Sequence, residues 1–289
     1  MIIIADSGST KTDWCLLSTE GKVASLQTEG INPVMQDDDT IKDILAEVVA
    51  NFPQNVNLSD CHFYGSGVRP EMKERMARLL FDALGVSSHA ESDLLGAARA
   101  LCGRSRGIAC ILGTGSNSCY FDGERIVENT PSLGYVLGDE GSGAVLGIRF
   151  INALFKKRLP ETLRQEFENE TGLLLTDIIQ RVYRKPMPNR FLASLSHFIV
   201  HHLACEPLCQ LVTDHFRTFF HHNIRPYGQA ALPVNAVGSI AFHYCEQLKE
   251  AARLEGFMLG RIERSPMEGL VAYHRVCEET VDNNNPIVI

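Results

Sequence analysis

The 289-residue sequence has no apolar run that approaches the roughly 18 residues needed for a membrane-spanning helix. It also lacks the basic leader of a signal peptide, because the chain passes through three isoleucines directly to Asp6. We therefore expect no membrane partner and a cytoplasmic location.

Positive charge is scarce, with 27 Lys and Arg against 35 Asp and Glu and a net charge of -8. A nucleic-acid surface needs clustered excess positive charge, so we expect no nucleic-acid partner. Paired cysteines are scarce too, since the nine cysteines are odd in number and scattered, with no Cys-x-x-Cys. This usage is typical of reduced, buried thiols in the cytoplasm.

Apolar residues make up 45% of the chain, and the length is sufficient for two domains. The stretch from Ile2 to Leu17 predicts a strand, a tight turn and a second strand. Its turn offers open backbone amides, hydroxyls and a cation, which together suit an anion, and Asp6 beside it suits a metal. The turn residues are Ser7, Gly8, Ser9, Thr10, Lys11 and Thr12. The alternative is an ordinary hairpin with a surface lysine.

A similar unit recurs about a hundred residues later. The predicted strand Gly107 to Leu112 is followed by Gly113, Thr114, Gly115, Ser116 and Asn117 and then by a second alternating run. We interpret the repeat as an internal duplication, with chance as the alternative, because the two turns share little beyond small and hydroxyl residues.

Three other junctions carry glycine or acidic residues. Asp93 stands between a predicted strand and a helix that runs to about Cys102. The segment Gly138 to Gly143 precedes a helix through Leu154, so the amides of the segment would sit at a helix N-terminus and face whatever lies in front. Gly238 and Ser239 follow a predicted strand and begin a helix to about Leu254. Residues 160–222 read as helical, with a break near Pro186 and Pro188.

These stretches together resemble a known superfamily. Asp6 to Thr12 is similar to the first phosphate motif of the sugar kinases, actin and heat-shock chaperones, Leu112 to Asn117 to the second, and Val234 to Ala241 to the adenosine motif. Within it, Ser92-Asp93, Leu112 to Asn117 and Gly138 to Ser142 resemble the N-acetylglucosamine kinases. These belong with the BadF/BadG/BcrA/BcrD ATPase family, which includes the benzoyl-CoA reductase activators.

The resemblance implies an α/β fold of two ribonuclease-H-like, actin-like ATPase domains that close over ATP, Mg²⁺ and a sugar in a cleft between them. We expect an N-terminal domain of residues 1–105, completed by a C-terminal helix within 266–289. Residues 106–265 would form the second domain, with a helical insertion. The resemblance also implies a homodimer.

Roles for individual residues follow from the same resemblance. Asp93 matches the base that accepts the proton of the sugar 6-hydroxyl, and Asp6 would orient Mg²⁺ through water. Thr10 and Thr114 would meet the phosphates, and Gly238 and Ser239 would meet the adenosine. The matched sugar-binding residues are Asn32, Gly115, Ser116, Asn117 and Asp139, and the remaining residues of the first turn together with Gly113 would contact the nucleotide.

Two departures bear on the substrate. Sugar kinases of this family often place tryptophans against the sugar, whereas this chain has Val34 and Leu133 at the matching positions. The reductase activators clamp an iron-sulfur cluster with cysteines in a glycine-rich setting, and none of the nine cysteines here has that setting. The first departure leaves the identity of the sugar substrate undecided. The second argues against membership of the reductase-activator branch.

Simpler interpretations exist for several residues. Asp93 suits a plain N-cap, and Asp139 and Glu140 suit pairing with a helix dipole. His197, His201, Cys205 and Cys209 follow one helical stripe that could hold zinc, although packing is the commoner use. His221 and His222 would serve packing or a subunit contact.

The sequence therefore leads to one main hypothesis, an ATP-dependent kinase that phosphorylates the 6-hydroxyl of a hexosamine, with N-acetylglucosamine as the leading candidate. The alternatives are an ATPase that drives a partner, as the activators do, and a non-catalytic sugar or nucleotide sensor.

Overall fold

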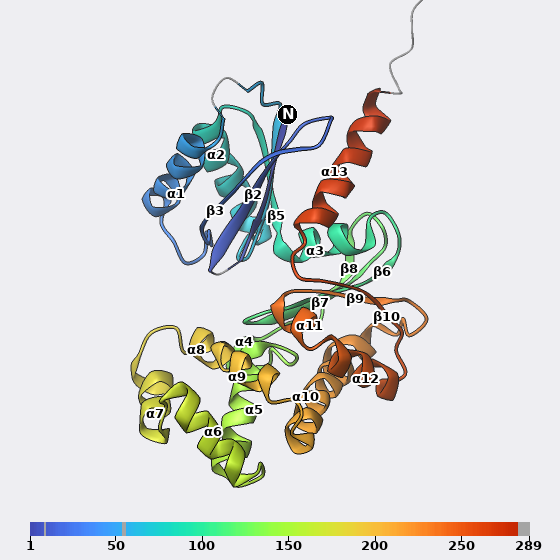
Figure 1. Cartoon of the computed structure of the whole chain (residues 1–289). Helices are drawn as coiled ribbons and strands as arrows, with labels where there is room; N and C mark the ends of the chain where they lie inside the picture. Colours follow the sequence, from blue (N-terminus) through green and yellow to red (C-terminus); the bar gives the residue numbers. More distant parts are fainter. Residues whose placement is uncertain (9, 54–55, 283–289) are drawn as a thin grey trace, which may run out of the picture. The chain divides into compact units, whose positions relative to one another are not determined.

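A computed structural model describes residues 1–8, 10–53 and 56–282, with side chains as far as Arg275. The chain divides into two compact units (Figure 1). Unit 1 consists of Met1–Ser105, Gly123–Arg125 and Ser265–Ile289, and unit 2 of Arg106–Asp122 and Ile126–Arg264. Within the described ranges, every helix is too short or too polar to cross a membrane.

Unit 1 is built on a five-stranded sheet of order β3-β2-β1-β4-β5. Strands β1, β2 and β3 form an antiparallel meander, and β4 and β5 continue the sheet parallel to β1. The strands are β1 (Ile2–Ser7), β2 (Lys11–Leu17), β3 (Lys22–Glu29), β4 (Asp60–Gly65) and β5 (Ser87–Ser92). The carboxyl ends of β1, β4 and β5 therefore share one edge, where ligands of such sheets usually bind.

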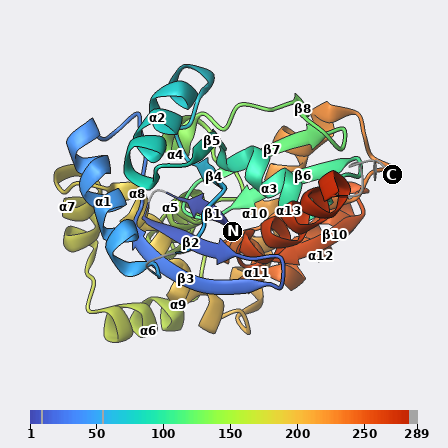
Figure 2. The same cartoon turned by 90° about the horizontal axis from the view of Figure 1, so that it is seen from above.

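Helices cover both faces of this sheet. The helical segments are α1 (Asp38–Asn51), a 3₁₀ turn (Pro70–Met72), α2 (Lys73–Leu84), α3 (Asp93–Cys102) and α13 (Met267–Asp282). Ile3 and Ala5 of β1 pack with α1 and α2, whereas Ile2 and Ile4 pack with α3 and α13. Successive strand residues point to opposite faces, so a continuous apolar strand is buried on both. Figures 1 and 2 both show α3 and α13 side by side.

The sheet of unit 2 repeats this topology, with order β10-β9-β6-β7-β8. Its strands are β6 (Gly107–Leu112), β7 (Ser116–Phe121), β8 (Ile126–Glu128), β9 (Val234–Val237) and β10 (Leu259–Glu263). Again the first three strands in sequence are antiparallel, and the last two run parallel to the first. The identical strand order and directions support the internal duplication that the two turns predict.

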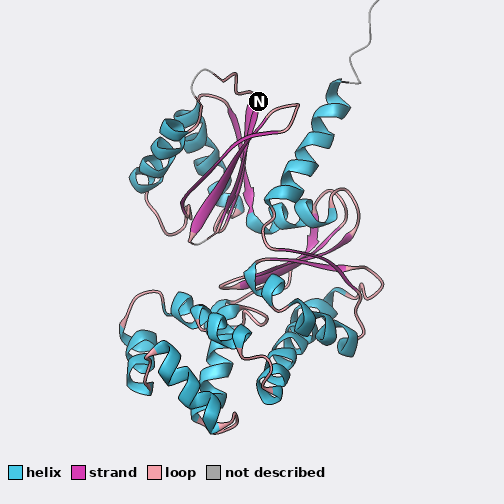
Figure 3. Cartoon of the chain, in the orientation of Figure 1, coloured by secondary structure: helices cyan, strands magenta, loops and turns pink. Residues whose placement is uncertain are grey.

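Unit 2 also carries a long helical region between β8 and β9 (Figure 3). Its helices are α4 (Gly134–Leu137), α5 (Gly143–Phe155), α6 (Glu161–Thr171), α7 (Leu175–Arg184), α8 (Pro188–Ser194), α9 (Ser196–His201) and α10 (Glu206–Phe219). A π-helical turn (Phe220–Ile224) and a 3₁₀ turn (Arg225–Tyr227) extend α10, and α11 (Ser239–His243) and α12 (Cys245–Glu255) flank the last strand.

The predicted elements are largely present, with two differences. The helix expected from Gly238 to Leu254 is divided at Tyr244, whose non-helical backbone lets its hydroxyl donate to the Ser196 carbonyl at 2.7 Å. Strand β8 was not predicted. The helix expected after the segment Gly138 to Gly143 is α5, which begins at Gly143 and follows a loop with Asp139 at a φ of 51°. The break near Pro186 and Pro188 is confirmed, since α7 ends at Arg184 and α8 begins at Pro188.

Candidate functional site

The first turn of unit 1 joins β1 to β2. The Gly8 N–H donates to the Lys11 carbonyl at 3.0 Å, and Ser7 pairs in register with Thr12. Gly8 and Thr10 are exposed, so their backbone is open to a ligand. Ser9 lies outside the described residues.

The hydroxyls of Ser7 and Thr12 are turned inward, and both residues are fully buried. They lie 2.7 Å apart; Ser7 Oγ also accepts from the Ile31 N–H at 2.9 Å, and Thr12 donates to the Glu29 carbonyl at 3.0 Å. These bonds tie the end of β3 to the turn. The two hydroxyls are thus occupied within the protein, which leaves Gly8, Thr10 and Lys11 as the open part of the turn.

Asp6 lies on β1, opposite Asp13 on β2 and beside Tyr64 on β4. Burial, and then the negative charges of Asp93 and Asp13, raise the pKa of Asp6 to about 7, and the charge of Lys11 opposes the rise. Lys11 is itself bound to Asp13, with Nζ 2.8 Å from Oδ2. The site therefore holds more negative charge than nearby cations neutralise.

A divalent cation fits this excess of negative charge. Among the described residues, there is no group of three or more His, Cys, Asp or Glu side chains placed to hold a metal. Mg²⁺ commonly uses one or two carboxylates together with waters and substrate phosphates, rather than an all-protein cage. Asp6 is suited to that arrangement.

Asp93 is the first residue of α3, at the same sheet edge as Asp6, because Ser7, Gly65 and Ser92 are register partners. The N-cap of α3 is Ser92, whose Oγ accepts from the Leu95 N–H at 3.2 Å. The interpretation of Asp93 as a plain N-cap is therefore wrong. Its Oδ1 accepts from the adjacent Leu94 N–H at 2.8 Å, and the carboxyl also accepts from its own backbone N–H. Burial outweighs these bonds and raises the pKa of the carboxyl to about 6.

Asn32 follows the buried Ile31 and organises a tight turn. Its Oδ1 accepts from the Val34 N–H at 3.0 Å, and its own N–H donates to Gln36 Oε1 at 2.7 Å. Gly67, at a φ of 79°, packs so closely that a Cβ there would lie 2.2 Å from Asn32 Oδ1. Arg75 of α2 holds the turn by binding the Pro33 and Gln36 carbonyls and Asp38. This arginine was not predicted, because its partners lie some 40 positions earlier in the chain.

In unit 2, the turn after β6 lies beside the residue that follows β9. These strands are parallel neighbours, with Ile111 opposite Val237, so Gly113 and Gly238 leave the sheet at the same edge. Gly238 has a φ of 121°, and a Cβ there would lie 2.3 Å from the Leu112 carbonyl oxygen. Only glycine allows this approach. The structure thus brings together Gly113, Thr114, Gly238 and Ser239.

Asp139 lies against the same turn. Its carboxyl accepts from the backbone of Ser116, and a Cβ added to Gly115 would be 3.1 Å from Oδ2. Burial raises the pKa of Asp139 to about 6. Ser116 Oγ donates to the Glu140 carbonyl at 2.7 Å, which fixes the loop. Gly115, Ser116 and Asp139 therefore form one cluster, as the sequence hypothesis requires.

The first amides of α5 do not face an open site. Gly143 and Ala144 donate to the carbonyls of Gly113 and Thr114 at 2.8 and 3.2 Å, and Val145 donates to Ser142 Oγ at 3.2 Å. The group in front of these amides is therefore the turn after β6, which they anchor to α5.

Three contacts around this loop escaped prediction. Asn117 Oδ1 accepts from Asn129 Nδ2 at 2.9 Å, which orients the Asn117 amide. His222, in the π-helical turn, has its Nδ1 3.0 Å from Glu140 Oε1, and Asn223 lies 3.4 Å from Oε2. Burial acts to raise the pKa of Glu140, but hydrogen bonds, including these two, outweigh burial and lower it. π-helical turns often occur at functional sites, although no local sequence signal marks this one.

The predicted His-Cys stripe is not one helical face. Helix α9 ends at His201 and α10 begins at Glu206, so Cys209 lies in a separate helix from His197, and Cys205 is the N-cap residue of that second helix. His201 Nδ1 contacts the His197 carbonyl at 2.7 Å. The cysteines with described side chains are not joined in disulfides.

Comparison with known proteins was made for sequence and structure. The sequence matches neither a model of a known protein family nor a curated protein. The structure is similar to a protein of Porphyromonas gingivalis, provisionally named an N-acetylglucosamine kinase, with a TM-score of 0.93 and 47% identity over 96% of this chain and 100% of that one. A protein of Chromobacterium violaceum with the same provisional name gives a TM-score of 0.73 and 20% identity over 94% and 98% of the two chains. The ROK hexokinase of Thermus thermophilus shares the fold, with a TM-score of 0.50 and 15% identity over 98% and 99%.

Proposed function

Because the chain belongs to the N-acetylglucosamine kinase-like family of the sugar kinase, actin and heat-shock chaperone superfamily, we propose that it is an ATP-dependent sugar kinase. The proposed reaction transfers the γ-phosphate of ATP to the 6-hydroxyl of a hexosamine, with N-acetylglucosamine as the leading candidate.

The observation that carries the proposal is the state of Asp93. Its side chain is not the N-cap of α3, because Ser92 has that role. Its carboxyl lies at the edge of the sheet where the parallel strands end, near the negative charge of Asp6, and burial raises its pKa to about 6. A base with a pKa slightly below neutral is ionised at pH 7 and can still take a proton from a hydroxyl. Such a base contributes about 10²- to 10⁴-fold to the rate. Asp93 would accept the proton as the sugar oxygen attacks the γ-phosphorus.

The nucleotide contacts follow the two turns. Gly8, Thr10 and Lys11 in unit 1 and Gly113 and Thr114 in unit 2 would bind the phosphates through backbone amides and hydroxyls. Gly238 and Ser239 would contact the adenosine. Asp6 would hold Mg²⁺, which when bound supplies positive charge to the phosphates. Ser7 and Thr12 would shape the first turn from within.

The sugar contacts would come from the Asp139 cluster and from the two oriented amides. Asp139 would accept hydrogen bonds from sugar hydroxyls, with Gly115 leaving room for the carboxyl and Ser116 fixing the loop. Asn32 and Asn117 would add amide contacts. Val34 and Leu133 are 43% and 63% exposed, so each presents an apolar surface that suits the methyl of an acetamido group.

The test is ADP release by the purified protein with ATP and Mg²⁺, against a panel of hexoses, hexosamines and N-acetylated hexosamines. We expect release to depend on the sugar and to be greatest with N-acetylglucosamine. Asp93→Asn should lower the rate by about 10²-fold or more, since the base is lost. Asp82→Asn, a change of an exposed carboxylate on α2, is the matched control and should leave the rate unchanged.

Each alternative gives a different result. ADP release without sugar would indicate an ATPase that drives a partner. Binding of a hexosamine without ADP release would indicate a sensor. An Asp93→Asn variant as active as the Asp82→Asn control would refute the assigned base.

A further inference from the structure

A pocket of about 370 Å³ lies in unit 2 between α5 and α10. This is within the range of volumes for small-molecule sites. Its lining residues are Arg149, Ala153, Arg158, Leu159, Pro207, Gln210, Leu211 and Asp214. None of these residues is among those proposed to contact ATP or the sugar, so the pocket has no part in the function already assigned.

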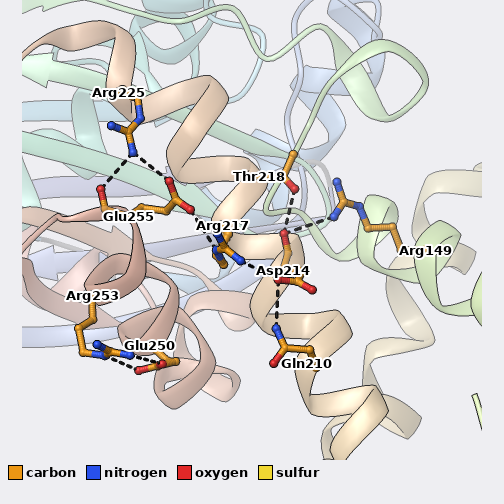
Figure 4. Close-up of polar contacts among 9 residues, drawn as sticks. All are labelled: Arg149, Gln210, Asp214, Arg217, Thr218, Arg225, Glu250, Arg253 and Glu255. Atoms are coloured by element: carbon orange, nitrogen blue, oxygen red, sulfur yellow. Dashed lines mark hydrogen bonds and ion pairs between the residues drawn. The ribbon is translucent and has the colours of Figure 1, made fainter.

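Arg149 is a half-buried cation in this lining that forms no direct ion pair among the described residues. A guanidinium nitrogen donates a 3.5 Å hydrogen bond to the Asp214 backbone carbonyl (Figure 4), and the carboxylates of Glu140 and Asp214 act on the guanidinium through their charges alone. Nearby arginines differ, because Arg217 and Arg225 both bind Glu255 directly, at 3.0 and 2.9 Å. A partly desolvated guanidinium whose N–H groups are not bonded to a carboxylate can donate them to a bound anion.

The acidic residue of the lining, Asp214, acts on Arg149 through its charge, but its carboxylate makes its direct contacts elsewhere. The Asp214 carboxylate accepts from Gln210 Nε2 at 3.1 Å and lies 3.3 Å from Arg217 (Figure 4). Its charge is therefore shared with Arg217 on its own helix, while Arg149 meets only its carbonyl.

A second arginine reaches the pocket through a tight turn after α5. Lys157 has a φ of 58°, a left-handed conformation that glycine usually adopts at the end of a helix. The Arg158 N–H then donates to the Ala153 carbonyl at 2.9 Å. The turn places the exposed Arg158 in the lining, where it donates to Asn152 Oδ1 at 2.8 Å. Lys156 and Lys157, also exposed, precede it in the chain. The pocket thus combines two guanidinium groups with the apolar side chains of Leu159 and Leu211.

We propose that this pocket binds a small organic phosphate. The phosphate lies between Arg149 and Arg158, since guanidinium groups donate paired hydrogen bonds to tetrahedral phosphate oxygens. The carbon part of the ligand contacts Leu159, Leu211 and Ala153. A dianionic ester balances the two arginines, and the pocket volume restricts it to a small metabolite.

The test is isothermal titration of the full-length protein with glycerol 3-phosphate. We expect saturable binding at one site, weakened about tenfold or more by Arg149→Gln and by Arg158→Gln, because each removes charged hydrogen bonds. Arg253→Gln, a change of an exposed arginine paired with Glu250 at 2.6 Å, is the matched control and should alter the affinity less than about twofold. Arg158 is exposed, so its variant keeps the fold even where the Arg149 variant does not.

Three results would overturn the proposal. The first is no saturable binding up to about 10 mM, weaker than the affinities usual for specific sites. The second is an affinity that neither Arg149→Gln nor Arg158→Gln changes, which would place the phosphate elsewhere. The third is equal binding of succinate, which would remove the preference for phosphate.

Discussion

At the scale of single residues, burial sets the chemistry of the carboxyls. Asp93 and Asp139, one in each unit, have pKa values raised to about 6 mainly by loss of water around the carboxyl. The two residues differ in their surroundings, because Asp93 accepts from the N–H of its neighbour, whereas Asp139 sits in a left-handed loop against Gly115. The raised pKa brings each group close to the range in which a proton can be both accepted and released.

The pKa of Asp93 predicts how the rate depends on pH. Only the ionised carboxylate can accept a proton, so kcat/KM for the sugar should fall as pH decreases through about 6, by at least about tenfold per pH unit well below that value. Protonation of Asp139, whose pKa is also about 6, makes the fall steeper. Initial rates from pH 4.5 to 8 measure the profile. A rate that is constant down to pH 4.5 would show that no carboxyl with this pKa takes part.

Gly238 carries a second prediction at this scale. Gly238→Ala should lower the free energy of unfolding by about 3 kcal/mol or more, because the φ of 121° is unfavourable and the Cβ meets the Leu112 carbonyl. Gly256→Ala, at a φ of 78° with open space around it, should cost only about 1 kcal/mol. Denaturant unfolding compares the two variants. Equal losses would mean that the close approach at Gly238 is unimportant.

At the scale of elements, α13 is attached to the first sheet through a cluster of histidines. His274 of α13 stacks on His62 of β4 with ring centroids 4.1 Å apart, and its Nε2 lies 2.9 Å from the Tyr64 hydroxyl. Burial lowers the pKa of His62 to about 4 and that of His274 to about 3. Charges of Arg99, Arg104 and His89 also disfavour protonation of His274, whereas Asp60 favours protonation of His62.

This cluster makes a contribution to the stability of unit 1 that acid removes. Below the ordinary histidine pKa of 6.5 the unfolded chain binds protons that the folded cluster rejects, so the contribution of the cluster to the free energy of unfolding falls as pH decreases from 6.5 toward 4. One such histidine accounts for about 2 kcal/mol between pH 7.5 and 5. Asp6 and Asp93 contribute the opposite trend, because their raised pKa values favour the folded state at low pH.

The variant His274→Gln isolates the histidine term. It keeps a polar group near the Tyr64 hydroxyl but cannot take up a proton, so it should lose about 2 kcal/mol less than the wild type between pH 7.5 and 5. Denaturant unfolding at the two pH values gives the difference. His243→Gln, on α11 of unit 2, is the control and should behave as the wild type does. An unchanged acid response in His274→Gln would contradict the account.

At the scale of the whole molecule, local patterns were enough to predict the duplicated α/β architecture. The apolar run of β1, the glycine turn after β6 and the helix after Ser92 are all encoded by neighbouring residues. Local patterns could not predict which polar groups form hydrogen bonds within the protein and are therefore not open to a ligand. Ser7 and Thr12 bind Ile31 and Glu29 from another strand, and the amides of Gly143 and Ala144 bind a turn about thirty residues earlier.

The same limit applies to the partners of the site residues. The choice between Ser92 and Asp93 as N-cap depends on one position, which sequence patterns do not resolve, and Glu140 meets His222 only through a π-helical turn. The expected homodimer and the residue roles stay predictions, because they concern ligands and partners that one chain does not contain.

The central claim, transfer of phosphate to a sugar hydroxyl with Asp93 as base, is tested most directly by ³¹P NMR of the reaction products. With ATP, Mg²⁺ and N-acetylglucosamine, we predict a new phosphomonoester resonance coupled to the protons on C6, absent with Asp93→Asn and present with Asp82→Asn. Free inorganic phosphate in place of the ester, or an ester formed equally well by Asp93→Asn, would contradict the claim.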